Sequence, residues 1–155
     1  MTIGVDVFEP WAGEERPLYL APMAGVSDLP YRLLAKECGA DITITEFTNS
    51  TALSREATTS WRRMESDPRE TPFIPQIFGG AMEDMVTAAS MLQASADVID
   101  LNFGCPAPKV TNICAGAALM GEPLKLVSMV EHIVDAVDIP VTAKMRLGTG
   151  QGPNN

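Results

Sequence analysis

Nearly continuous apolar runs of strand length recur along the 155-residue chain, and this rhythm constrains the fold more than any other feature of the sequence. Turn-forming residues bound each run. Continuous apolar runs are typical of strands that are covered on both faces in a parallel sheet. We therefore predict strands at Leu18–Met23, Ile42–Phe47, Phe73–Phe78, Val98–Leu101 and Val141–Met145.

Amphipathic patterns with a period of about 3.6 residues separate the predicted strands and indicate helices. Ser27 or Asp28 can cap the first helix, and Gly39 can stop it. A weaker pattern, rich in Thr and Ser, spans 50–64, and a stronger one spans 82–92. The last helix is expected after Pro123, with a buried face made of Leu126, Val127, Val130, Ile133, Val134 and Val137.

This alternation of strands and helices predicts an α/β fold with a parallel sheet and right-handed crossovers. A doubly wound sheet and part of a (β/α)8 barrel both fit it. A doubly wound nucleotide-binding fold often has a glycine-rich turn after its first strand, but here residues 21–25 read Ala-Pro-Met-Ala-Gly. We therefore predict a partial TIM (β/α)8 barrel of about four βα units and a fifth strand, because a complete barrel needs roughly 250 residues.

Composition excludes several classes of protein. The 46% of hydrophobic residues is too high for a disordered chain, and no apolar stretch reaches the ~18 residues of a membrane-spanning helix. The net charge of −9 does not attract nucleic acid, so an RNA partner needs a local basic patch. Three cysteines without a CxxC spacing and one histidine predict no metal site, reduced thiols and a cytoplasmic location.

Chemistry in a parallel barrel is found where the strands end and the following loops begin. Cys105 is the most informative residue there, because it lies between a glycine and a proline just past a predicted strand. Its thiol can act as a nucleophile or, when protonated, as a general acid, and the alternative is a small buried residue in a tight turn. We expect a packing role for Cys38 and Cys114, with Cys38 in the core.

Other polar residues at the predicted strand ends also have two readings. Lys144 can face an anionic partner such as an electron-rich flavin ring, or it can pair with Glu46 or Asp100. Arg146 can bind a phosphate or carboxylate, or remain solvated. The amides of Gln76 and Asn102 can pair with the imide edge of a flavin or pyrimidine, or cap loop backbone.

At these residues the sequence resembles the tRNA-dihydrouridine synthase family of flavin enzymes. The matching segments follow the family's order and spacing over roughly residues 18–148, and they are Leu20–Asp28, Thr45–Phe47, Pro75–Ile77, Asp100–Pro106, Ala115–Leu119 and Val141–Gly148. The resemblance implies an FMN-dependent oxidoreductase that reduces uridine in tRNA to 5,6-dihydrouridine with NADPH or NADH.

In that family the flavin passes hydride to C6 of uracil and a cysteine protonates C5, and the matching cysteine is Cys105. The same match assigns flavin contacts to Pro22, Met23, Ala24, Gln76 and Lys144, and substrate contacts to Asn102 and Arg146. A related alternative is a flavoenzyme like dihydroorotate dehydrogenase that acts on a free pyrimidine.

The resemblance also predicts how the chain is organised. Residues 1–148 correspond to the N-terminal part of a flavin-binding barrel, and 149–155 read as a flexible tail. Family members continue through three more strands and a helical domain that binds tRNA, and we find neither here. We therefore expect a truncated chain that is inactive alone and flavin-free, or a half barrel completed by a second copy or by a complementing half.

Overall fold

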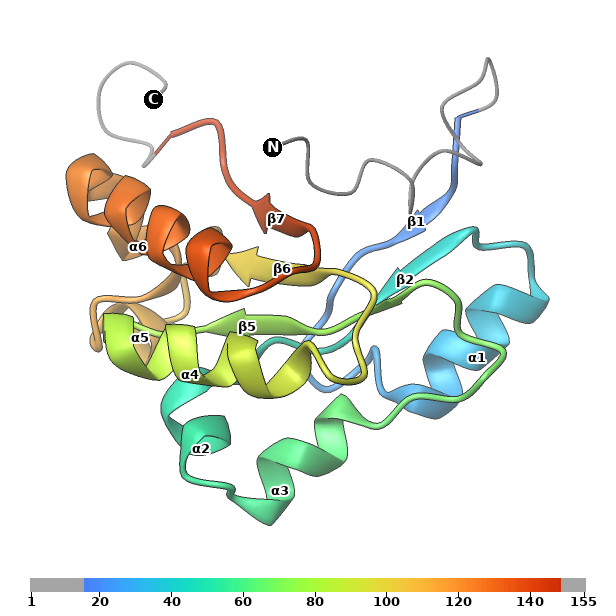
Figure 1. The fold of residues 1–155 in the computed structure, drawn as a ribbon. Coiled ribbons are helices and arrows are strands. Elements are labelled where there is room, and N and C mark those ends of the chain that lie inside the picture. Colours follow the sequence, from blue (N-terminus) through green and yellow to red (C-terminus); the bar gives the residue numbers. More distant parts are fainter. Residues whose placement is uncertain (1–15, 149–155) are drawn as a thin grey trace.

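The computed structural model describes residues 16–148, and in this range every strand pairs with its neighbours in parallel (Figure 1). One sheet has the order β1 (Tyr19–Leu20), β2 (Ile42–Ile44) and β4 (Phe73–Ile74). The other has the order β3 (Thr48–Asn49), β5 (Gln76–Phe78), β6 (Ile99–Asn102) and β7 (Val141–Lys144). The predicted α/β class and parallel sheet are confirmed.

The second predicted strand, 42–47, is shorter than expected, because β2 ends at Ile44 and β3 begins only at Thr48. The third predicted strand is divided between the two sheets. The predicted strand 73–78 breaks at Pro75, which has no N–H to donate to a neighbouring strand. Across the break, the N–H of Thr45 donates to the Ile74 carbonyl at 3.1 Å, and the N–H of Gln76 donates to Thr45 Oγ1 at 2.9 Å. Side-chain and backbone hydrogen bonds therefore join β2 and β4 to β3 and β5.

The first strand is shorter than predicted. Leu18–Met23 was expected to be extended throughout, but the chain turns at Met23, whose carbonyl accepts from the N–H groups of Val26 and Ser27 at 3.1 and 3.0 Å. In the described residues β1 and β7 each pair on one side only, so the sheet is not closed into a barrel. The arrangement is that of a partial TIM barrel.

The helices near the start of the fold follow their capping signals. Helix α1 (Leu29–Glu37) begins after Asp28, whose carboxylate accepts from the N–H of Tyr31 at 3.1 Å. It ends before Gly39, which takes a φ of +98° that favours glycine. The weak helix predicted at 50–64 is divided into α2 (Ser50–Ser54), α3 (Thr58–Trp61) and the 3₁₀ turn η2 (Arg62–Met64).

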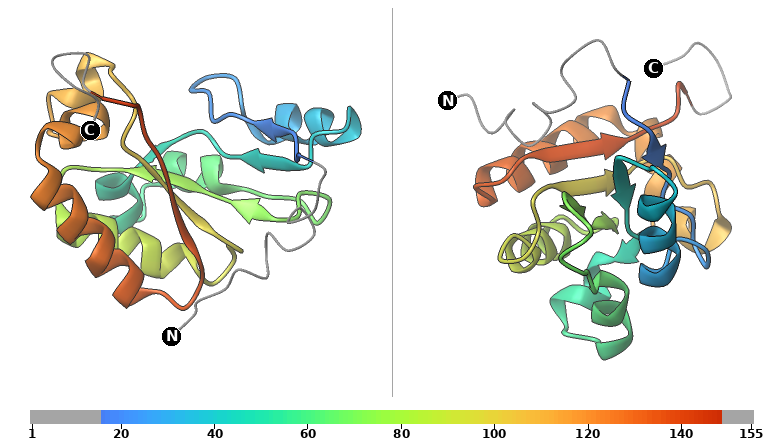
Figure 2. Two further views of the ribbon diagram at one scale, coloured as in Figure 1. Left: turned by 90° about the horizontal axis from the view of Figure 1, so that it is seen from above. Right: turned by 90° about the vertical axis from the view of Figure 1, so that its right-hand side faces the viewer.

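Helices α4 (Met82–Leu92) and α6 (Pro123–Ala136) cover the outer face of the second sheet (Figure 2). Between β6 and α6 the chain also forms α5 (Pro108–Thr111) and the 3₁₀ turn η3 (Gly116–Gly121). The outer-face core includes Ile77, Ile99, Leu101, Met85, Ala89, Leu92, Met129 and Ile133. The buried face predicted for α6 is confirmed at Ile133 and Val137 but is wrong at Val127, which is 51% exposed, because the helix turns Met129 inward instead.

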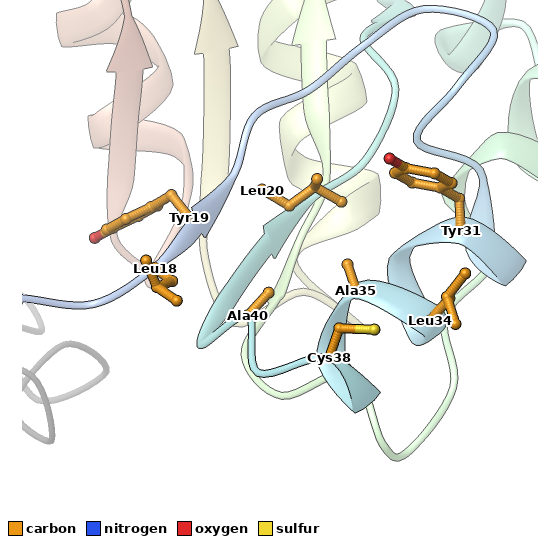
Figure 3. A pocket seen from close by; sticks show the side chains of 8 residues that line it. All are labelled: Leu18, Tyr19, Leu20, Tyr31, Leu34, Ala35, Cys38 and Ala40. Carbon is orange, nitrogen blue, oxygen red and sulfur yellow. The ribbon is translucent and has the colours of Figure 1, made fainter.

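The inner face of the sheet carries a cavity of about 340 Å³, lined by residues of β1, β2, β4, β6 and β7 that include Leu20, Ile44, Ile74 and Thr142. A separate apolar groove of about 360 Å³ lies between β1 and α1 and is lined by Leu18, Tyr19, Leu20, Tyr31, Leu34, Ala35, Cys38 and Ala40 (Figure 3). Cys38 is therefore exposed, not in the core as expected.

Among residues 16–148 no helix is long and apolar enough to cross a membrane. The predicted tail, 149–155, lies outside the described residues.

Candidate active site

A pocket of about 440 Å³ opens at the carboxyl ends of the strands, where sequence analysis places the chemistry. Five of the predicted site residues line it together: Pro22, Asn102, Cys105, Lys144 and Arg146. They come from the loop after β1, from the end and following loop of β6, and from the end and following loop of β7. Segments that are far apart in sequence thus converge on one pocket.

Strand register explains why these polar side chains meet. Successive side chains of a strand point to opposite faces, so residues two apart share a face. In β6, Ile99 and Leu101 join the core under the helices, whereas Asp100 and Asn102 face inward. Parallel pairing sets Asn102 opposite Lys144, and Asp100 opposite both Gln76 and Thr142. The inner face therefore carries a polar row that ends at the pocket.

The loop that carries Cys105 is held by hydrogen bonds on several sides. Asn102 Oδ1 accepts from the N–H groups of Gly104 and Cys105 at 3.2 and 2.9 Å. Arg146 Nε donates to the Gly104 carbonyl at 2.7 Å, and the N–H of Ala117 donates to the Cys105 carbonyl at 2.9 Å. The half-buried thiol of Cys105 is thereby presented to the pocket from a fixed backbone.

Below the pocket, Gln76, Asp100 and Asn102 form a buried hydrogen-bonded row. Gln76 Nε2 donates to Asp100 Oδ2, and Asn102 Nδ2 donates to Gln76 Oε1 at 3.0 Å. The hydroxyl of Thr142 donates to Asp100 Oδ1 at 2.6 Å. Burial raises the pKa of the Asp100 carboxyl above its ordinary value, while the bonds from Thr142 and Gln76 and the charge of Lys144 act in the opposite direction.

Lys144 presents an exposed ammonium group to the pocket. The side chain of Lys144 makes no hydrogen bond or ion pair with another residue of the described range, so the direct pairing considered for it is not formed. Glu46 Oε2 lies 3.7 Å from Arg63 Nε instead. The charge of Lys144 lowers the pKa of Asp100 without contact between the two side chains. The cation is available to an anionic or electron-rich ligand.

The remaining predicted site residues lie beside the pocket or behind it. Gln76 is fully buried behind Asn102, and both ends of its side-chain amide are already bonded. Met23 and Ala24 continue the chain from Pro22 without lining the cavity. Sequence analysis did not single out Phe47, a wall of the pocket that packs edge-on against Phe78 with ring centroids 5.4 Å apart. Its position directly after the Thr45-Glu46 strand end was the available signal.

A second buried polar cluster holds the loop after β1. Arg32 of α1 forms a bidentate ion pair with Glu70 in which Nη2 donates to Oε2 at 3.0 Å. Arg32 Nη1 donates to the Ser27 carbonyl at 3.0 Å, and Ser27 Oγ accepts from the N–H of Met23 at 2.9 Å. Glu70 also accepts from the hydroxyl of Thr43 at 2.8 Å. This cluster, which we call the Arg32–Glu70 cluster, ties α1, β2 and the turn after β1 together.

The lining of the pocket is suited to a planar ring that carries carbonyl oxygens. The Asn102 amide has a second N–H that is free to donate, and the Lys144 ammonium can stabilise negative charge on such a ring. Pro22 and Phe47 offer apolar walls, and the Cys105 thiol supplies a proton or a nucleophile. The residues of 16–148 contain no cluster of three His, Cys, Asp or Glu side chains that could hold a metal ion.

Comparison with known proteins shows which family this chain is similar to. A family model described as dihydrouridine synthase matches residues 19–154. A probable tRNA-dihydrouridine synthase of Rhizobium leguminosarum is 42% identical over 137 residues, which cover 88% of this chain and 43% of the relative. A tRNA-dihydrouridine synthase B of Pseudomonas putida is 41% identical over 141 residues, covering 89% of this chain and 41% of the relative.

A third relative, tRNA-dihydrouridine synthase B of Shigella flexneri, is 40% identical over 132 residues, covering 84% of this chain and 41% of its own length. The chain thus spans less than half of the length of these relatives. The family model nevertheless covers nearly all of the described residues, including both polar clusters and the pocket. This chain belongs to the dihydrouridine synthase family.

Proposed function

We propose that residues 1–148 form the N-terminal part of the catalytic barrel of an FMN-dependent enzyme that reduces uridine in tRNA to 5,6-dihydrouridine, with NADPH or NADH as reductant. The observation that carries this proposal is the meeting of Cys105, Asn102 and Lys144 around one pocket at the strand ends of a dihydrouridine synthase family chain. A tRNA substrate fits the expected cytoplasmic location.

FMN, when bound, supplies the hydride that reduces the pyrimidine. Pro22, with Met23 and Ala24 beside it, forms one wall for the flavin ring. The Lys144 ammonium stabilises negative charge at the ring, because no other side chain of the described range neutralises that ammonium by contact. Gln76 acts on the flavin side of the pocket by holding the Asn102 amide in place.

Cys105 delivers the proton that completes the reduction at C5 of uracil. An ordinary thiol is largely protonated at neutral pH and can therefore act as a general acid. The thiol lines the pocket, and the backbone N–H and carbonyl of Cys105 are both hydrogen-bonded, which holds in place the backbone that carries the thiol. Asn102 and Arg146 contact the substrate from the same loop face.

The charge and the open edges of the sheet indicate what this chain needs from elsewhere. A net charge of −9 disfavours association with RNA, so affinity for RNA is expected to come from additional polypeptide. The edges of β1 and β7 are expected to pair with further strands, from a longer protein or from a second copy of this chain.

The first experiment is a titration of the purified chain with FMN, followed by absorbance and by the mass of the eluting species. We expect Lys144→Gln to weaken FMN binding by about tenfold, since charge-assisted hydrogen bonds are worth more than neutral ones. Lys125→Gln on α6 is the matched control, because it removes the same charge away from the pocket. Equal affinities of the two variants, or no flavin bound to the unmodified chain, would contradict the proposed cofactor site.

The second experiment measures dihydrouridine formed in tRNA, with NADPH as reductant, by these residues within a full-length, FMN-loaded protein of the family. Cys105→Ala should lose about 10²- to 10⁴-fold of the rate, as expected for a general acid, and should retain FMN. Cys114→Ala is the control, since this exposed cysteine lies outside the pocket lining. Reduction of free orotate but not of tRNA would favour the free-pyrimidine alternative, and an unchanged rate in Cys105→Ala would remove the proton-donor role.

A further inference from the structure

Asp100 is a buried carboxylate for which the proposed reaction has no direct use. Only 3% of the residue is exposed, and it faces the inner cavity, not the pocket that Cys105 lines. Both of its oxygens are bonded, Oδ1 to the Thr142 hydroxyl at 2.6 Å and Oδ2 to Gln76 Nε2. An ionised carboxylate can only accept hydrogen bonds, so Asp100 dictates which end of the Gln76 amide faces it.

The orientation of the Gln76 amide sets the orientation of the Asn102 amide. Because the Gln76 NH₂ group faces Asp100, Gln76 Oε1 faces Asn102 and accepts from Nδ2 at 3.0 Å. Asn102 therefore turns Oδ1 toward the loop, where it accepts from the N–H groups of Gly104 and Cys105. Each amide has one donor end and one acceptor end, so the direction of one fixes the direction of the next.

The two ends of the row enforce the same direction. An acceptor-only carboxylate lies at one end, and donor-only backbone N–H groups lie at the other. Reversing both amides would set acceptor against acceptor at Asp100 and donor against donor at Cys105. At the buried Asp100 end such a mismatch leaves polar groups unpaired, which is costly because water cannot replace the lost partner.

We infer that Asp100 is a positioning residue, which sets the direction of the Gln76 and Asn102 amides and thereby holds the loop that presents Cys105 to the pocket. The inference rests on the proposed function only where it treats Cys105 as the proton donor. The positioning itself is a property of this chain, because every hydrogen bond in the row lies within the described residues.

The chain carries its own reporters for the test. Cys38 is exposed in the groove between β1 and α1, far along the sequence from the half-buried Cys105. The rate of alkylation of Cys105 by iodoacetamide, divided by that of Cys38 in the same sample, therefore measures the local state of the loop. Mass spectrometry of peptides from the whole 155-residue chain gives both rates without flavin or tRNA.

Asp100→Leu removes the acceptor and keeps the branched shape of the side chain. It should raise the Cys105-to-Cys38 ratio about fivefold, the factor that corresponds to roughly one lost hydrogen bond. Asp100→Asn should restore the ratio of the unmodified chain, since its Oδ1 can accept from Gln76 while its Nδ2 donates to Thr142 Oγ1. Thr142→Val is the matched control, because it removes a bond to the same carboxylate but leaves the Gln76 bond in place.

An unchanged ratio in Asp100→Leu would overturn the inference, and so would an equal rise in Thr142→Val, which would show a general response to lost buried polarity. Should Asp100→Leu not fold, Gln76→Met cuts the same row nearer the loop and must raise the ratio; no rise would again overturn the inference. Because the measurement uses no cofactor, a chain that fails to bind FMN still gives a decisive result here.

Discussion

The Arg32–Glu70 cluster and the Asp100 row are both buried and both reach a loop at the pocket, but they are built differently. Arg32 and Glu70 are opposite charges that bond each other and close on neighbouring segments. Asp100 is a single charge bonded to neutral groups, and its row ends at the backbone N–H of Cys105. The Arg32–Glu70 cluster therefore holds segments of the chain in position, whereas the Asp100 row sets the direction of side-chain amides.

The largest expected effect comes from breaking the Arg32–Glu70 ion pair. Arg32→Met should lower the free energy of unfolding by about 3–5 kcal/mol, because it leaves the buried Glu70 carboxylate without its counter-charge. Chemical denaturation measures the loss. The double variant Arg32→Met with Glu70→Leu should cost less than the sum of the two single variants, and a strictly additive result would contradict the pair as a unit.

A smaller effect is expected at Gly116, which packs against the Cys105 loop. Its φ is +58°, and an added Cβ would lie 2.6 Å from the Cys105 carbonyl oxygen and 2.7 Å from Val110. Gly116→Ala should therefore lower the free energy of unfolding by about 1–3 kcal/mol and change Cys105 alkylation. Gly121→Ala is the control, since an added Cβ there meets nothing within 4 Å; equal losses would argue against strain at Gly116.

A comparison of carboxylates should show opposite dependences on pH. Hydrogen bonds from Thr51 and Ser54 hold the pKa of Asp84 below its ordinary value of 3.8, so its contribution to stability is present above 3.8 and is lost as the pH falls below it. Burial raises the pKa of Asp100 above 3.8, so its contribution is present below 3.8 and is lost as the pH rises through the raised value.

Denaturation of the unmodified chain, Asp84→Asn and Asp100→Asn between about pH 3 and pH 7 checks both signs. The advantage of the unmodified chain over Asp84→Asn should shrink on acidification. Its stability relative to Asp100→Asn should grow on acidification. If both stability differences changed in the same direction with pH, burial would not be the main cause of the pKa shift of Asp100.

The smallest effect is expected for an exposed ion pair that, like the buried one, joins an arginine to a carboxylate. Asp67 Oδ1 and Arg69 Nε lie 2.8 Å apart at the surface, and the hydrogen bond from Arg69 lowers the pKa of Asp67 to about 2. Arg69→Ala should leave the melting temperature at neutral pH unchanged within error, because solvent and salt screen such pairs. A loss of stability as large as that of Arg32→Met would show that burial does not explain the difference between the two ion pairs.

The parts of the fold that follow local patterns could be predicted, and those that depend on register could not. Apolar runs and capping residues located the strands and α1, and Pro75 explains one break by its missing N–H. The row of Asp100, Gln76 and Asn102 needed the pairing of β5 with β6, which brings together residues 24 and 26 positions apart. Sequence patterns therefore identified Gln76 as a polar site residue without revealing that its amide is already occupied.

The order of the strands has a consequence for how the chain is made. Each strand pairs in parallel with strands one or two places away along the chain: β1 with β2, β2 with β4, β3 with β5, β5 with β6 and β6 with β7. A chain that emerges from the ribosome at about 5–20 residues per second therefore needs to wait for at most two further strands before it can extend the sheet. Assembly can follow synthesis, with β6 and its cysteine loop joining a surface that β1 to β5 have already begun.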